Sequence, residues 1–81
     1  MDLKDTVKLM ESDKYWQRFQ AETLQLRIRI EKLAAMLEKW DRGALDFAPV
    51  CPRTLLEKQL RAMRRYLEAL EERAEIEGIE V

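Results

Sequence analysis

The chain has no histidine and only one cysteine, Cys51, among its 81 residues. A single cysteine cannot form an intrachain disulfide. Zinc sites usually need about four Cys, His or carboxylate ligands, so the ordinary sets of zinc ligands are missing. Histidine is also the commonest general base of enzymes. We therefore predict a protein that uses no metal and no cofactor and that is not an enzyme.

Long apolar runs and a charge of one sign are missing as well. The longest purely apolar run, Ala34–Leu37, is far shorter than the roughly 20 residues that cross a bilayer. The first residues, Met1–Asp5, lack the layout of a signal peptide. Charged residues make up 38% of the chain, yet the net charge is only −1, whereas nucleic-acid-binding domains are typically strongly basic. These features predict an intracellular protein with Cys51 reduced and with no membrane or nucleic-acid partner.

A heptad pattern fills the first half of the chain. Eight residues follow one another at alternating spacings of three and four, which is the seam of a long helix. Thr23 is the only polar member of this seam, which comprises Trp16, Phe19, Thr23, Leu26, Ile30, Leu33, Leu37 and Trp40. The pattern predicts a helix over residues 13–41, with Ser12 and Asp13 as capping residues and Gly43 just beyond its end.

Glycine and proline are scarce, with two of each, and they mark where the helices end. Residues 42–52 form an apolar loop that we expect to pack over the end of a helical hairpin. A second seam follows at spacings of 4, 3, 4, 3 and 4: Leu56, Leu60, Met63, Leu67, Leu70 and Ala74. It predicts a helix over residues 53–77, ended by Gly78 with Ile79 in a Schellman-type contact. Two starts stay open, with Pro52 as the first helical residue or a capping box of Thr54 and Glu57.

The two long helices are expected to be antiparallel neighbours because the loop is short. A short helix over residues 3–11 precedes them, and it is stable only if it docks on the hairpin. We predict an all-α fold in which residues 1–81 form one helical domain. Charge supports the antiparallel arrangement, because the basic half of the second helix lies beside glutamates of the first, and its acidic half lies beside basic residues.

Both long helices carry more apolar residues than one hairpin can bury. Two explanations stay open: the short N-terminal helix covers part of the surplus, or a second copy covers it. We expect a helical-bundle homo-oligomer, a dimer or larger. Its predicted interface residues lie off the two seams and comprise Leu24, Ile28, Leu55, Ala62, Tyr66, Ala69 and Ile76.

Arginine is the residue type best suited to bind an anionic ligand here, because guanidinium groups grip phosphates in a bidentate manner. In a symmetric oligomer, arginines from two chains would converge with an aromatic ring and hold a nucleotide by charge and stacking. The candidate ligand-binding residues are Arg27, Arg29, Arg61, Arg64, Arg65, Trp16 and Tyr66. Ordinary salt bridges to the glutamates are the alternative. The glutamates of the second helix lack a facing cluster, so we expect no metal site.

The chain resembles a family of short proteins encoded by phages and prophages of Gram-positive bacteria. The resembling segments cover nearly the whole chain: Thr6–Met10, Tyr15–Phe19, Lys39–Trp40, Leu45–Phe47, Pro49–Pro52, Gln59–Met63, Tyr66–Leu67 and Ala74–Ile79. The resemblance carries over no functional residue. It implies a small accessory protein of a mobile element, acting in the bacterial cytoplasm.

In that context a counter-defence protein is our leading hypothesis. Such a protein sequesters a nucleotide-derived signal or blocks a host protein. The alternative is a structural or adaptor protein that offers helices to a partner and binds no small molecule. The near-neutral charge and the lack of a helix-turn-helix pattern disfavour a nucleic-acid regulator.

Overall fold

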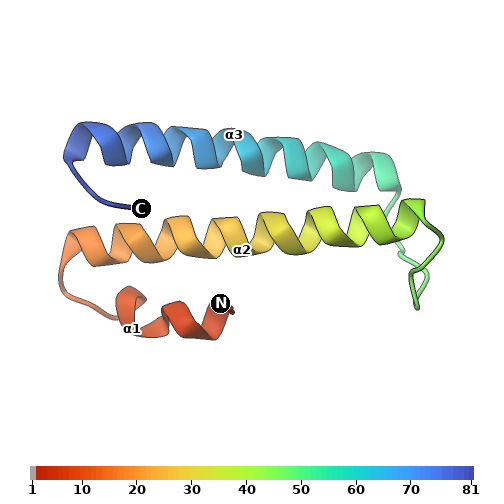
Figure 1. Ribbon diagram of the computed structural model, residues 1–81, viewed down its shortest axis with the longest axis horizontal. Helices are drawn as coiled ribbons and strands as arrows, with labels where there is room; N and C mark the ends of the chain where they lie inside the picture. The colour runs from red at the N-terminus through yellow and green to blue at the C-terminus, as the bar shows by residue number, and fades with distance from the viewer. Residues whose placement is uncertain (1) are drawn as a thin grey trace.

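The protein is built from two long antiparallel helices and a short helical segment at the N-terminus (Figure 1). The computed structural model describes residues 2–81. The 3-10 helix η1 spans Leu3–Thr6, α1 spans Val7–Met10, α2 spans Tyr15–Asp41 and α3 spans Arg53–Glu77. The described residues contain no strand, so the predicted all-α class and the hairpin are confirmed.

The helix ends fall close to the predicted positions, although the N-cap of α2 is Lys14 and not Ser12 or Asp13 as predicted. Gly43 and Gly78 have φ angles of 69° and 70°, a region that favours glycine, and each follows the last turn of a long helix. The Ile79 N–H donates to the Ala74 carbonyl at 2.8 Å, and Ile79 packs against the core. These contacts confirm the predicted end of α3.

The predicted range of α3, residues 53–77, is confirmed, but neither of the two capping arrangements predicted at its start is present. Pro52 is extended, with ψ at 142°, and serves as the N-cap, so the first helical residue is Arg53. The Pro52 carbonyl accepts hydrogen bonds from the N–H groups of Leu55 and Leu56. Thr54 therefore lies inside the first turn, where it cannot cap the helix.

The core lies between α2 and α3. Phe19, Leu26, Leu70 and Ala74 form its buried cluster, and the predicted seams supply all four. Leu37 and Leu60 are buried as well. Thr23 is fully buried, and its hydroxyl donates to the Phe19 carbonyl at 3.2 Å. The two seams therefore supply the core as their spacing predicts, except that Trp16 at the first position is 45% exposed.

The N-terminal segment, residues 2–11, docks on the other face of α2, so that α2 lies between this segment and α3 (Figure 1). Thr6 is fully buried there, and its hydroxyl accepts a hydrogen bond from the Gln25 amide at 2.9 Å. Asp2 lies 3.2 Å from the Lys32 ammonium. This answers one of the open questions, because the segment covers part of the apolar surplus of α2.

Docking of the N-terminal segment corrects the predicted oligomer interface. Ile28 is only 6% exposed, and Leu24 is half-buried. Ile28 shares the docking face of α2 with Gln25 and Lys32, because residues three, four and seven apart lie on one side of a helix. Ile28 was therefore wrongly assigned to a contact with another chain.

The loop that joins α2 to α3 differs from the expectation that it packs over the end of the hairpin. Val50 is fully exposed and Phe47 is 54% exposed. An ion pair closes the loop instead, because the Arg53 guanidinium donates two hydrogen bonds to Asp41, at 2.9 and 2.7 Å. These bonds, with Glu57, raise the pKa of Arg53 above its usual range.

Candidate functional site

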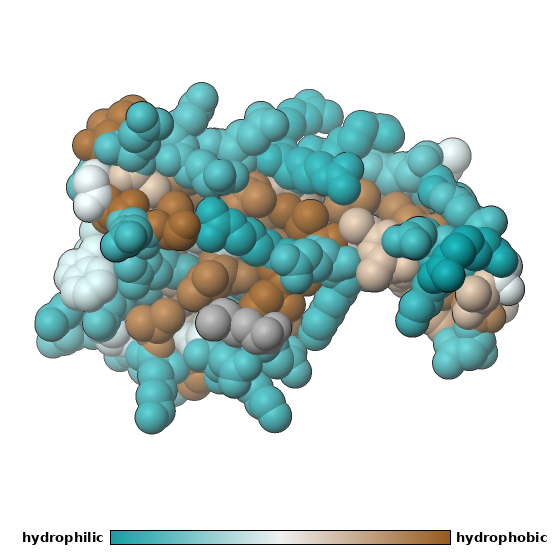
Figure 2. All heavy atoms as spheres, in the orientation of Figure 1, coloured by the Kyte–Doolittle hydropathy of each residue, from teal (hydrophilic) through white to brown (hydrophobic). Residues whose placement is uncertain are grey.

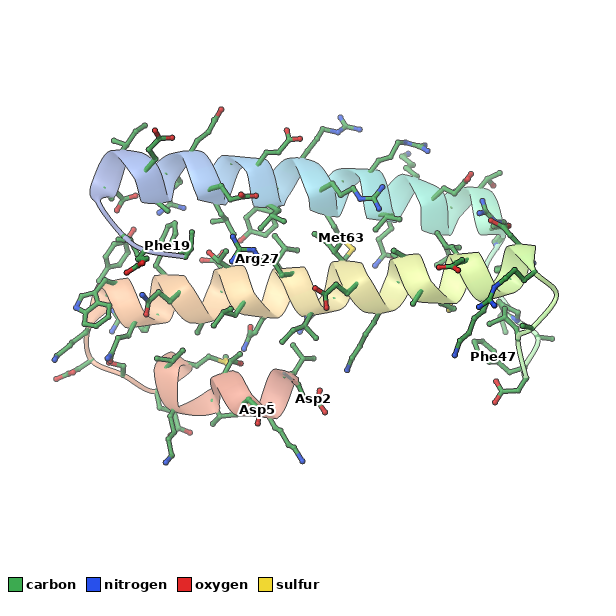
Figure 3. The ribbon with its side chains drawn as sticks, viewed as in Figure 1. Asp2, Asp5, Phe19, Arg27, Phe47 and Met63 are labelled. Carbon is green, nitrogen blue, oxygen red and sulfur yellow. The ribbon has the colours of Figure 1, made fainter. Side chains whose placement is uncertain are left out.

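The structure separates two arginines that are close together in the sequence. Arg27 and Arg29 are two residues apart on α2, about 200° around the helix axis, so they project from opposite sides. Arg27 lies between α2 and α3 (Figure 3), 3.9 Å from the Glu71 carboxylate. Arg29 lines two of the cavities of the structure.

The largest of these cavities lies between α2 and α3 and has a volume of about 540 Å³. Arg29 and Lys32 of α2 and Gln59 of α3 supply its polar lining. The remaining lining is apolar: Leu26, Leu33, Met36, Leu56 and Met63. Its size falls within the range of roughly 300–1,000 Å³ that is usual for small-molecule sites.

A second cavity of about 250 Å³ adjoins the first, because both are lined by Leu26 and Arg29. Glu22, Gln25 and Tyr66 complete its lining. The Tyr66 hydroxyl donates to the Glu22 carboxylate, which ties α3 to α2 at this point. Arg29 thus lies on the border between two hollows, with an aromatic ring beside it.

A third cavity of about 300 Å³ continues past Lys32 and Met36 towards the loop. Its further lining comes from Ala35, Lys39, Leu45, Asp46 and Phe47. Figure 2 shows a hollow below α2, between the N-terminal segment and the loop. Asp2 and Phe47 lie on its two sides (Figure 3). We call the three adjoining cavities the basic groove.

The chemistry of the basic groove suits a ligand that is both anionic and partly apolar. Arg29, Lys32 and Lys39 supply positive charge along one edge of α2, while Glu22 and Asp46 also line the cavities and Lys32 pairs with Asp2. Arg29 forms no ion pair with any other residue of the described chain, 2–81. Tyr66 and Phe47, about half exposed, offer aromatic faces near the two ends. Charge for a phosphate and rings for a base are therefore available along one groove.

The structure brings together only part of the predicted ligand set. Arg29 and Tyr66 line one cavity, as the hypothesis requires. Arg27 pairs with Glu71 on the other side of the hairpin. Trp16 lies at the start of α2 with the Lys14 ammonium 5.8 Å from its ring centroid. The remaining three are exposed on α3 and lie outside the three cavities: Arg61, Arg64 and Arg65.

Sequence reasoning missed Lys32, Lys39 and Phe47 as site residues. A signal for the two lysines was present, since Arg29, Lys32 and Met36 are spaced three and four apart and so share one edge of a helix. Phe47 carried no such signal, because its position depends on the path of the loop.

The predicted interface residues of α3 remain exposed. Leu55 is 52% exposed, Tyr66 47% and Ile76 85%. Ala62 and Ala69 are exposed between them. This part of the predicted interface is uncovered within the chain, in contrast to Ile28.

Residues 2–81 contain neither a cluster of metal-binding side chains nor a candidate membrane span. No three side chains of the metal-binding types gather closely enough to form a ligand set within this range. None of the helices in the same range is both long and apolar enough to span a membrane.

Comparison with known proteins places the hairpin in a family. No curated protein and no solved structure matches the chain. The model of the family described as Sequestin matches residues 13–76. The match covers α2, the loop and nearly all of α3, and it begins after the N-terminal segment. Since it spans well over half of the sequence, the chain belongs to the Sequestin family.

Proposed function

We propose that the protein is a non-enzymatic binding protein that sequesters a nucleotide-derived anion in the basic groove. The observation that carries this proposal is the position of Arg29. Its guanidinium borders two adjoining cavities and has no carboxylate partner among residues 2–81, while an apolar floor and Tyr66 lie beside it. The name of the family is consistent with a sequestering function.

We further infer that the protein serves a phage or prophage and acts in the cytoplasm of the bacterial host. A signal made by a bacterial defence system fits the groove in chemical class, since such signals join phosphates to flat bases. Sequestration needs a stable complex and no chemical step, and the groove offers charge, rings and apolar surface for one.

A ligand panel tests the proposal directly. We expect a cyclic dinucleotide or an ADP-ribose derivative to raise the melting temperature and to bind in isothermal titration. Arg29→Ala should weaken binding by about 10- to 100-fold, because a hydrogen bond to a charged group contributes about 1.5–3 kcal/mol. Arg42→Ala is the matched control, since Arg42 is exposed at the end of α2 and lines none of the three cavities, and it should bind like the wild type.

The cellular role has its own test. Expression of the chain in bacteria that carry a nucleotide-signalling defence should restore phage plating, and Arg29→Ala should abolish that effect at equal protein level. Equal restoration of phage plating by the wild type and by Arg29→Ala would show that the basic groove is not needed for the effect.

The adaptor function remains the second candidate, and the loop favours it. Phe47 and Val50 expose apolar side chains at one end of the hairpin. An adaptor should show no thermal shift with any nucleotide of the panel. It should instead retain a host protein on an affinity column, and the double substitution Phe47→Asp and Val50→Asp should abolish that retention.

A further inference from the structure

One face of α3 carries a further heptad whose two end residues and two alanines stay exposed, while Tyr66 and Arg73 within it already bind residues of α2. Its members are spaced 4, 3, 4, 3, 4 and 3, and they are Leu55, Gln59, Ala62, Tyr66, Ala69, Arg73 and Ile76. We call them the outer stripe. Leu55 and Ile76 are 52% and 85% exposed, and Ala62 and Ala69 are exposed between them. Gln59 and Tyr66 also line the basic groove, so the stripe and the groove share one side of the hairpin.

The outer stripe is nearly symmetric about Tyr66. Leu55 and Ile76 occupy its two ends, and Ala62 and Ala69 lie four and three residues from Tyr66. When two copies of α3 run antiparallel, Leu55 of each copy meets Ile76 of the other, and Ala62 meets Ala69. Small residues at these positions allow close approach of the two helices.

Charge selects the same orientation. The first half of α3 is basic, with Lys58, Arg61, Arg64 and Arg65, and the second half is acidic, with Glu68, Glu71, Glu72, Glu75 and Glu77. An antiparallel pair sets each basic half beside an acidic half, whereas a parallel pair sets like charges side by side. The α3 helix is therefore complementary to a second, reversed copy of itself.

We propose that two copies pack antiparallel through this side of the hairpin, forming a four-helix bundle with the two basic grooves facing each other at its centre. Arg29 is one residue from the midpoint of α2, and Tyr66 is one residue from the midpoint of α3. A two-fold axis through these midpoints gathers both residues from both subunits. The ligand site is then shared, with two guanidinium groups and two phenol rings around one anion.

The dimer is inferred from the outer stripe and the charge pattern of α3, without reference to a ligand. The shared ligand site rests in addition on the proposed function. Two guanidinium groups at the centre of a dimer require counter-charge, which a ligand with two phosphates supplies. A cyclic dinucleotide is itself two-fold symmetric, so it matches the axis. We therefore expect one ligand for every two chains.

The mass in solution tests the dimer. Light scattering should give about 19.4 kDa, twice the chain mass of 9.7 kDa. Ala62→Glu and Ala69→Glu place a charge within the stripe, and each should give a monomer with an unchanged circular dichroism spectrum. Thr54→Glu adds the same charge to α3 outside the stripe and should leave a dimer. A wild-type mass of 9.7 kDa at 0.1 mM protein would overturn the proposal.

Disulfide cross-linking tests the orientation. With Cys51→Ser removing the native thiol, an equimolar mixture of Ala62→Cys and Ala69→Cys should oxidise to a mixed dimer. Each variant alone should resist oxidation, because seven residues of helix displace identical positions by about 10 Å, and disulfides need Cα atoms within about 7 Å. Ready cross-linking of Ala62→Cys with itself would contradict the antiparallel pair.

Titration with cyclic di-AMP and with ADP-ribose separates the two proposals. We expect one ligand for two wild-type chains and at least tenfold weaker binding to the monomeric Ala62→Glu variant. A monomer that binds one ligand for each chain would contradict the shared site but would still support the proposed function. A dimer that binds neither probe would contradict the proposed function for these ligand classes but would support the proposed dimer.

Discussion

Thr23 is a polar residue that packs within an otherwise apolar helix seam. It is fully buried among apolar neighbours, and its hydroxyl donates to the Phe19 carbonyl one turn earlier. That carbonyl already accepts the backbone N–H of the same turn. The hydroxyl therefore has its hydrogen-bond partner within α2. Among residues 2–81 it forms no hydrogen bond to α3.

Thr23→Val should leave the free energy of unfolding unchanged or raise it by up to about 1 kcal/mol. The substitution removes a buried hydroxyl and leaves no donor or acceptor unsatisfied. Thr23→Ala is the control and should lower stability by about 1 kcal/mol, because it also deletes a buried methyl group. Urea denaturation measures both, and a loss greater than about 1 kcal/mol for Thr23→Val would give the hydroxyl a structural role.

The sequence predicts the core residues well, because their spacing is regular. Phe19, Leu26 and Leu70 are seam positions and are buried. The site is harder, because neighbours in sequence need not share a side of a helix. Arg27 and Arg29 look like one cluster in the sequence, but a rotation of about 100° for each residue separates them. Which of these two sides of α2 carries the cavities depends on how the two helices face each other.

Among the elements, the N-terminal segment depends most on specific polar contacts. Asp2 caps η1 in a reciprocal capping box with Asp5, and Thr6 and Gln25 hydrogen-bond across to α2. The segment is too short to be stable alone in water. The sequence did not decide whether the segment docks, because periodicity predicts apolar faces but does not predict individual hydrogen bonds.

Low pH should release the N-terminal segment before it unfolds the hairpin. The Leu3 N–H, followed by Lys32, lowers the pKa of Asp2 below its ordinary value of 3.8. The Asp2 carboxylate therefore stabilises the docked segment at pH values above 3.8, and this contribution is lost as the pH falls towards the lower pKa of the folded state.

Amide hydrogen exchange and the chemical shift of the Leu3 amide measure this release. Asp2→Asn keeps the shape of the side chain and removes its titration, so the Leu3 amide should no longer follow this pH dependence. Identical titration curves for the two proteins would assign the change to another carboxylate.

As a whole molecule, the protein is elongated and leaves several large apolar side chains exposed. Its extents are 43 × 24 × 17 Å, so most residues lie at or near the surface. The described core cluster holds four buried residues, and small domains with such cores usually gain stability from an additional source. A second copy packed on the outer stripe is the source that we infer.

The melting temperature should therefore rise with protein concentration. A dimer that unfolds to two chains is stabilised by mass action, whereas a monomer is not. Raising the wild-type concentration 100-fold should shift the transition by several degrees, and the monomeric Ala62→Glu variant should show no shift. Calorimetry at several concentrations measures both, and a constant wild-type transition would contradict the dimer.

The exposed thiol of Cys51 gives the hairpin a single chemical handle at its loop end. A spin label attached there marks one end of a rod about 43 Å long. In an antiparallel pair the two labels lie at opposite ends of the particle, while in a parallel pair they lie together at one end. Dipolar electron spectroscopy therefore reports on the relative direction of two chains from the unmutated sequence.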